Sequence, residues 1–447
     1  MTFWQDTSLM TILIVGLLLG VSKILQKNPF LNLKNIPFSI VAGLLGFALQ
    51  NMGCLTIDQH AMERIVYHGL AITFIAIGLQ KPPKEAQNKD AIAMGLGFSI
   101  MAVLQGFVAI LCLAILSLFD SLQHPGLGLL LPLGLNQGPG QALSMGNAWE
   151  ATGLQDGGQM GLILAASGFL WAIVCGIPLA IYGQKKGWIQ LPSNDQDKKE
   201  HLEQSKPSSD FNTHCIAIAV IYVCTFGMLY GLDQYVLAEK PKLMSMLWGF
   251  HFLIALLLSL STRALWSKIH FDLSNKALTE ITNTTVDFVT CTGLIAVQVS
   301  ILTANLFMIS LLSFLGLLVT FFGTLYLSQR GFGKDRFAHA LLWFGASTGT
   351  LPMGIALLRI ADPQLQSTAT TSATKGAAFA LIFSAPLLLF VMPYAITQWP
   401  DNYPTTYYTL IGILIVYMGF IVFCWKKMAN LGVYSSFLDK NGSEINT

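Results

Sequence analysis

Charged residues are scarce in this chain. Asp, Glu, Lys and Arg make up 11% of its 447 residues, and 53% are hydrophobic, whereas soluble domains have roughly 25% charged residues. The apolar residues gather in repeated runs of about 20, the length that crosses a bilayer as a helix. This composition excludes an ordinary soluble domain and predicts a polytopic membrane protein surrounded by lipid. We expect no nucleic-acid partner.

Sequence patterns of catalysis and metal binding are also scarce. The seven cysteines include no Cys-x-x-Cys pair, and the eight histidines are dispersed without the spacing of metal ligands. A phosphate-binding Gly-x-x-x-x-Gly-Lys loop is absent. We therefore expect a protein that is not an enzyme and that holds no cofactor.

One apolar stretch is interrupted in a way that an ordinary spanning helix does not tolerate. Between Leu130 and Gln141 it contains two prolines, three glycines and three side-chain amides: Pro132, Pro139, Gly134, Gly138, Gly140, Asn136, Gln137 and Gln141. Proline breaks the helical hydrogen-bond ladder, and glycine favours unwound backbone. In a bilayer, such backbone is tolerated only where protein buries it or where it lines a water-filled cavity.

A similar order of residues returns far downstream. Both stretches follow Leu-Leu-x-x-Gly-x-polar-polar-Gly, one from Leu130 to Gly138 and the other from Leu341 to Gly349. Two interrupted segments in corresponding halves of a membrane protein are typical of transporter binding sites. We therefore predict re-entrant hairpins at 129–147 and 338–357.

The remaining apolar runs divide the chain into two halves, 1–184 and 213–398. Spans are predicted at 9–26, 36–53, 65–80, 91–118 and 158–184, then at 213–231, 243–260, 284–304, 306–328 and 376–398. The polar stretch 185–212 is predicted to be a flexible cytoplasmic linker. Region 399–447 adds one more span, 407–425, and a cytoplasmic tail.

The stretch 262–283 is more polar than the predicted spans on either side of it. It contains Trp266, Lys268, His270 and Lys276 among apolar residues. A helix with one charged face and one apolar face lies in the plane of the membrane interface. We therefore predict an interfacial amphipathic helix at 262–283.

The distribution of Lys and Arg predicts how the chain is oriented. With the N-terminus outside, only Arg64, Lys240 and Lys242 of the 25 basic residues fall outside, which agrees with the positive-inside rule. The first half then starts outside and the second starts inside. The predicted fold class is thus an all-α polytopic protein with two inverted-topology five-helix repeats. Each repeat has a re-entrant hairpin before its last helix, and one extra C-terminal transmembrane helix follows.

Several stretches resemble the bacterial glutamate:sodium symporter (ESS) family. Ile36-Pro37 with Val41–Leu45 is similar to the family's Ile-Pro-x-x-Val-Ala-Gly-Gly stretch, and 74–79 is similar to its Phe-x-Ala-x-Ile-Gly-Leu stretch. Residues 129–146 and 344–357 take the place of its two Gly-rich re-entrant loops. The resemblance covers about 10–400.

This chain also departs from the family pattern. The family's Gly-Gly-His-Gly-Thr run is here Asn136 to Gln141, without the His, and its His-Cys-Gly-Phe-Gly-Leu-Gly run is here Phe344 to Thr350. The resemblance implies a divergent member in a bacterial inner membrane, with Na⁺-coupled uptake of glutamate or a related small carboxylate. It also implies a homodimer.

The residues expected to contact the small anionic solute lie mostly on the two interrupted segments. They are Asn136, Gln137, Gly138, Gly140, Gln141, Ser347, Thr348, Gly349, Thr350 and Arg359. Ends of broken helices present free backbone donors that suit a carboxylate, and unwound carbonyls suit Na⁺. Arg359 could bind a carboxylate in bidentate fashion, or it could pair with Asp362.

Na⁺ as coupling ion requires oxygen ligands, and it is the only metal ion expected. Three candidates belong to the predicted span 284–304 or lie next to it: Asn283, Asp287 and Gln298. The alternatives are the same fold with another solute or with H⁺ coupling, and, from another class, a channel or a non-transporting membrane scaffold. The composition alone does not separate them.

Overall fold

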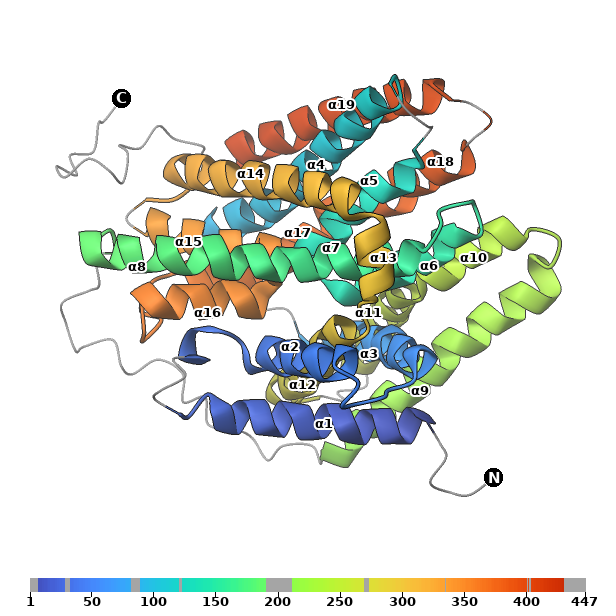
Figure 1. Ribbon diagram of the computed structural model, residues 1–447, viewed down its shortest axis with the longest axis horizontal. Coiled ribbons are helices and arrows are strands. Elements are labelled where there is room, and N and C mark those ends of the chain that lie inside the picture. The colour runs from blue at the N-terminus through green and yellow to red at the C-terminus, as the bar shows by residue number, and fades with distance from the viewer. Residues whose placement is uncertain are drawn as a thin grey trace.

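The structure, a computed structural model, describes residues 7–28, 33–81, 89–119, 123–189, 211–268, 273–333, 335–399, 401 and 403–429. Every regular element in these ranges is a helix (Figure 1). Within these described ranges, eight helices are long and apolar enough to cross a membrane, or nine if one bent pair counts as a span. The predicted all-α polytopic membrane protein is confirmed at this level.

Apolar side chains cover much of the outer surface. Leu17, Val223 and Val416, on three different long helices, are each more than half exposed. Soluble monomers rarely expose apolar surface on this scale, whereas lipid tails accommodate it at no cost. The exposed apolar faces are therefore those of a multi-pass protein toward lipid.

The first part of the chain forms a series of helices that ends before the predicted linker. They are α1 (Thr7–Leu25), α2 (Phe38–Asn51), α3 (Gln59–Leu79), α4 (Lys89–Leu116), α5 (Pro125–Pro132), α6 (Pro139–Glu150), α7 (Gly157–Trp171) and α8 (Ile177–Lys186). Of the predicted linker 185–212, residues 190–210 lie outside the described residues, whereas 185–186 end α8 and 211–212 begin α9.

The second part contains more helical segments, because several of its helices are broken. They are α9 (Phe211–Gly231), α10 (Pro241–Gly249), α11 (His251–Lys268), α12 (Asn275–Ile295), α13 (Val299–Ala304), α14 (Leu306–Gly331), α15 (Arg336–Gly349), α16 (Leu351–Ala361), α17 (Ala369–Pro386), α18 (Met392–Thr397) and α19 (Thr405–Met428). The extra helix predicted at 407–425 is α19.

Two predicted elements between residues 262 and 304 are wrong. The interfacial helix predicted at 262–283 does not exist as a unit, because its first residues end α11 and its last ones begin α12. The span predicted at 284–304 is instead α12 followed by a break and the short α13. Because the first half of α12 is polar, hydropathy placed the start of the predicted span at 284, whereas the helix begins at Asn275. Most side chains of that half are exposed, and Leu278 is the one buried residue of 275–284, whereas the second half from Val289 to Ile295 is buried.

Two other predicted spans differ in length or shape. Where the sequence predicts 36–53, α2 has 14 residues, which at 1.5 Å per residue is shorter than the roughly 30 Å hydrocarbon layer. The span predicted at 243–260 is the pair α10 and α11, bent by 62°. Helix α2 begins only after Pro37, and the bend between α10 and α11 is not revealed by apolar composition.

The first interrupted segment folds back on itself as a helical hairpin, here called hairpin A (125–150). It consists of α5, a π-helical turn at 133–137 and α6. The two ends of the hairpin lie together: Nε2 of His124, just before α5, is 3.4 Å from Oγ1 of Thr152, just after α6. Every residue of α5 is buried.

The second interrupted segment is also a hairpin, here called hairpin B (336–361), formed by α15 and α16. Its arms touch through backbone, since a methyl group on Gly354 would lie 2.3 Å from the carbonyl oxygen of Leu342. Asp335, just before α15, accepts hydrogen bonds from N and Oγ1 of Thr368 beyond α16, both 2.9 Å long. In Figure 1, hairpin A lies toward the right of the molecule and hairpin B toward the left.

One long helix runs past both hairpins. Helices α7 and α8 continue each other through a π-helical turn at 172–176. Gly161 in α7 packs against the backbone of Ala142 in hairpin A, and Gly183 in α8 packs against the ring of Phe337 in hairpin B. Helix α7 also contacts hairpin B, because Gly168 packs against the carbonyl of Thr348, so the long helix touches both hairpins.

The close approach within hairpin B predicts the effect of adding one methyl group. We expect Gly354→Ala to lower the free energy of unfolding by about 1–3 kcal/mol, the usual cost of overpacking, because backbone atoms of Leu342 have no room to yield. Gly412→Ala in α19 is the matched control, since nothing lies within 4 Å of its added Cβ. Thermal unfolding of the two variants in detergent gives the comparison, and equal stability would contradict the packing described.

Candidate functional site

The tip of hairpin A is a single glycine in a conformation that other residues rarely adopt. Gly138 has φ 90° and ψ −179°, and α6 begins directly after it with Pro139. Glycine reaches positive φ without steric cost. The chain reverses here inside the protein, so the predicted interruption at this position is confirmed.

The tip of hairpin B is Thr350, with φ 117° and ψ 162°. A residue with a side chain held at such dihedrals stores roughly 1–3 kcal/mol of strain, and strain of this kind clusters at functional sites. The repeated sequence pattern aligns Gly138 with Gly349, but the backbone breaks one residue later, after α15 has ended at Gly349.

The two tips touch. A methyl group added at Gly138 would lie 2.8 Å from Cγ2 of Thr350. Residues more than 200 positions apart in the chain thus meet where α5 gives way to α6 and α15 gives way to α16. The two interrupted segments are therefore in direct contact.

The amides of hairpin A have different partners. Nδ2 of Asn136 donates to the carbonyl oxygen of Phe98 in α4 over 3.1 Å. Nε2 of Gln141 donates to Oε1 of Gln137 over 3.0 Å. Oε1 of Gln141 is buried and has no hydrogen-bond partner among the described residues, which is rare for a polar atom inside a protein.

The side chains of Ser347 and Thr348 in hairpin B are fully buried. Thr348 donates to the carbonyl oxygen of Phe344 one turn back, as hydroxyls in helices often do. Oγ of Ser347 has no partner in the described part of the chain. The carbonyl of Ser347 accepts a 3.0 Å hydrogen bond from Nε2 of Gln105 in α4, which also donates to Oγ1 of Thr320 over 2.8 Å.

Ser347 also stands in a Gly-x-Ser-x-Gly sequence, Gly345 to Gly349. A serine nucleophile of that pattern sits on a sharp turn between a strand and a helix. Here the whole pattern lies inside α15, so the structural context of a nucleophile elbow is missing at this position. The pattern gives no support to hydrolase chemistry.

A small cavity adjoins the tip of hairpin B. Asp287 and Thr290 of α12, Ser39 of α2 and Thr350 are its polar lining residues. Asp287 was predicted near the start of a span, but it lies in the middle of α12 and is half-buried. Of the three ion-coupling candidates, Asp287 is the one that the structure brings to a hairpin tip.

The other two ion-coupling candidates lie elsewhere. Asn283 is exposed on α12. Gln298 was placed deep in a span, yet it stands at the break between α12 and α13, where its backbone N–H donates to Oε1 of Gln159 over 3.1 Å. Arg359 is exposed in the last turn of α16, roughly 13 Å along the helix from Thr350 at 1.5 Å per residue.

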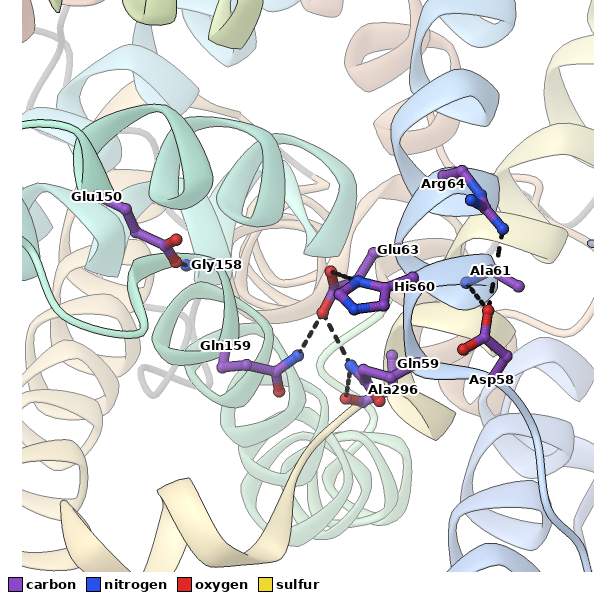
Figure 2. A network of polar contacts seen from close by, with 10 residues as sticks. All are labelled: Asp58, Gln59, His60, Ala61, Glu63, Arg64, Glu150, Gly158, Gln159 and Ala296. Carbon is purple, nitrogen blue, oxygen red and sulfur yellow. Dashed lines mark hydrogen bonds and ion pairs between the residues drawn. The ribbon is translucent and has the colours of Figure 1, made fainter.

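Through Gln159, the backbone of Gln298 joins a separate polar network. Figure 2 shows Glu63, Gln59 and Gln159 of this network. Oε1 of Glu63 accepts hydrogen bonds from Nε2 of Gln59 and Nε2 of Gln159, of 2.9 and 3.0 Å. Gln59 also donates to the carbonyl of Ala296. These bonds join α3 and α7 to the break after α12, so they hold the broken backbone in place.

Three residues at the tips were absent from the predicted site: Gln105, Ser39 and Thr290. Gln105 could have been found as a lone amide in an apolar run, although such amides usually join packed helices. Ser39 follows Pro37, just inside a helix start. No spacing rule connects α2 with the tip of hairpin B, because their contact depends on the tertiary fold.

No protein-family model matches the chain, and neither a curated protein nor a solved structure matches it significantly.

The two hydrogen bonds of Gln105 predict a stability difference. We expect Gln105→Leu to cost about 1–3 kcal/mol, because it leaves the buried carbonyl of Ser347 without its donor. Thr320→Val should cost less, since Gln105 still donates to Ser347 in that variant. Denaturation of both in detergent measures the order, and a Thr320→Val variant as unstable as Gln105→Leu would contradict this role.

Proposed function

We propose that this protein is a secondary active transporter of a bacterial inner membrane. It takes up glutamate or a related small carboxylate together with Na⁺ by alternating access, as a divergent member of the glutamate:sodium symporter family. The observation that supports this most is the contact of two interrupted hairpins at Gly138 and Thr350, with buried unpartnered polar atoms nearby.

The order of elements supports two repeats of opposite orientation. The series α1, α2, α3, α4, hairpin A and α7–α8 has the same order as α9, α10–α11, α12, α14, hairpin B and α17–α18. With the orientation predicted from Lys and Arg, hairpin A enters from outside and hairpin B from the cytoplasm. A solute held between the tips is then released to one side by movement of one hairpin.

The ends of the hairpin arms suit a carboxylate. Helix α6 begins at Pro139 and α16 begins at Leu351, so the first turns of both start next to the meeting point of the tips. Helix N-termini present free N–H groups and a partial positive charge. Asn136, Gln141 and Ser347 add side-chain donors and acceptors around the same place, and Arg359 attracts the anion at the cytoplasmic end.

The electrical driving force is sufficient for accumulation. Each net positive charge that enters with the solute gains about 2.3 kcal/mol per 100 mV of membrane potential, which corresponds to more than a tenfold concentration ratio. Symport of one carboxylate with more than one Na⁺ moves net positive charge inward, so the membrane potential would drive it. A Na⁺ gradient would add to it.

Uptake of labelled glutamate into proteoliposomes tests the proposal. We expect accumulation when Na⁺ is higher outside and little when choline replaces Na⁺. Asn136→Ala and Ser347→Ala should reduce uptake about tenfold or more, because each removes a polar group at the tips. Thr374→Ala, an exposed position of α17 whose hydroxyl bonds only within its own helix, should transport as the wild type does.

Two other outcomes would identify rival functions. The family's His is missing from the loop at Asn136 to Gln141, which favours a search for other solutes. Uptake that persists without Na⁺ removes the coupling ion, and a thermal-shift screen of carboxylates and neutral solutes then finds the substrate. Ion currents larger than a carrier can produce would indicate a channel. If neither the wild type nor the tip variants transport any solute, the protein would be a scaffold.

A further inference from the structure

The cavity beside Thr350 is closed to organic solutes but large enough for an ion. Its space for the centre of a water-sized particle is about 10 Å³, which is about the minimum for a single water molecule. It lies between the start of α2, the middle of α12 and the tip of hairpin B, and Phe169 of α7 closes one side. A bare monovalent cation fits such a space, whereas glutamate does not.

The cavity contains one full charge, the carboxylate of Asp287. Ser39 lines the cavity beside Asp287, and Lys23 at the end of α1 acts on the carboxylate through space. No Lys, Arg or His of the described residues forms an ion pair with it within 4.0 Å. A carboxylate in the middle of a membrane helix is costly unless it has a partner of opposite charge.

Hydroxyl oxygens complete the lining. Thr290 follows Asp287 by three residues and so lies on the same face of α12, where it is 4% exposed. Ser39 and Thr350 contribute from the other two elements. Oxygen atoms of side chains and unwound backbone are the ligands that Na⁺ takes at interrupted helices.

Helix dipoles leave the carboxylate as the dominant charge. At the tip of hairpin B the negative end of α15 meets the positive end of α16, so their partial charges of about half a unit largely cancel. The start of α2 adds a partial positive charge, which is smaller than the full charge of Asp287. The balance favours a cation.

We infer that this cavity binds one Na⁺, with Asp287 as the charged ligand and Ser39, Thr290 and Thr350 as further oxygen ligands. The role of this Na⁺ as the coupling ion of transport rests on the proposed function, whereas the existence of the binding site does not. Because Thr350 also touches Gly138, an ion that ties Thr350 to α12 stabilises the meeting of the two tips. Ion binding and solute binding are then favourably coupled, each raising the affinity for the other.

The test is a Na⁺ titration of the purified full-length protein in detergent, without solute and with choline keeping the ionic strength constant. The unfolding temperature of the wild type should rise with Na⁺, because a ligand that binds only the folded state stabilises it. Asp287→Asn should abolish the rise, and Ser39→Ala and Thr290→Val should weaken the apparent affinity at least threefold. Glu63→Gln is the control, since Glu63 is also partly buried but lies in the separate network.

The outcomes separate this site from the proposed transport. A folded Asp287→Asn protein with the full Na⁺ response, or a wild type without any response, overturns the site. If Asp287→Asn does not fold, unchanged affinity in both hydroxyl variants overturns it instead. If the Na⁺ response depends on Asp287 but the protein takes up no solute, the site is confirmed and the transport proposal is contradicted. If Na⁺ drives uptake but Asp287→Asn keeps the full Na⁺ response, the transport proposal is supported and the site is contradicted.

Discussion

Backbone polarity at the hairpin tips is the constraint on which the arrangement depends. Where α5 and α15 end, carbonyl and N–H groups lose their helical partners, and lipid offers none. Side-chain amides of neighbouring elements take over part of this pairing, as Gln105 does for the carbonyl of Ser347. Most of both hairpins is accordingly buried among α4, α7, α12 and α14, whereas Glu150 and Arg359 at their outer ends are exposed.

The same constraint explains the unusual composition of α12. Asp287 and the polar residues before it would be excluded from a helix that faces lipid. Asp287 is half-buried and Thr290 is buried where α12 packs against α2 and α3, whereas most polar residues before Asp287 are exposed. A polar helix beside two interrupted hairpins gives the molecule an interior that differs from its apolar surface.

Much of the architecture could be predicted from sequence, because long apolar runs indicate spanning helices and clustered prolines and glycines indicate where a helix is interrupted. The interruptions at Gly138 and near Gly349 were recognisable for this reason. The breaks at 250 and 296–298 were not, since no proline marks them and polar residues there pair through the tertiary fold. Gln298 was misplaced as a consequence, as was the start of α12.

The candidate site was predictable only in part. Asn136, Gln141 and Ser347 could be found because amides and hydroxyls stand out in apolar sequence. The cavity at Asp287 could not, because it joins residues 39, 287 and 350, and their proximity arises from packing between separate helices.

The π-helical turn at 172–176 has a consequence for how the two hairpins relate. A π turn inserts one residue, so the helix beyond it is rotated by about 100° relative to an uninterrupted one. The long helix thereby presents one flank to Ala142 and another to Phe337. Gly161 contacts hairpin A while Gly168 and Gly183 contact hairpin B, so a displacement of either hairpin must be accommodated by the same helix.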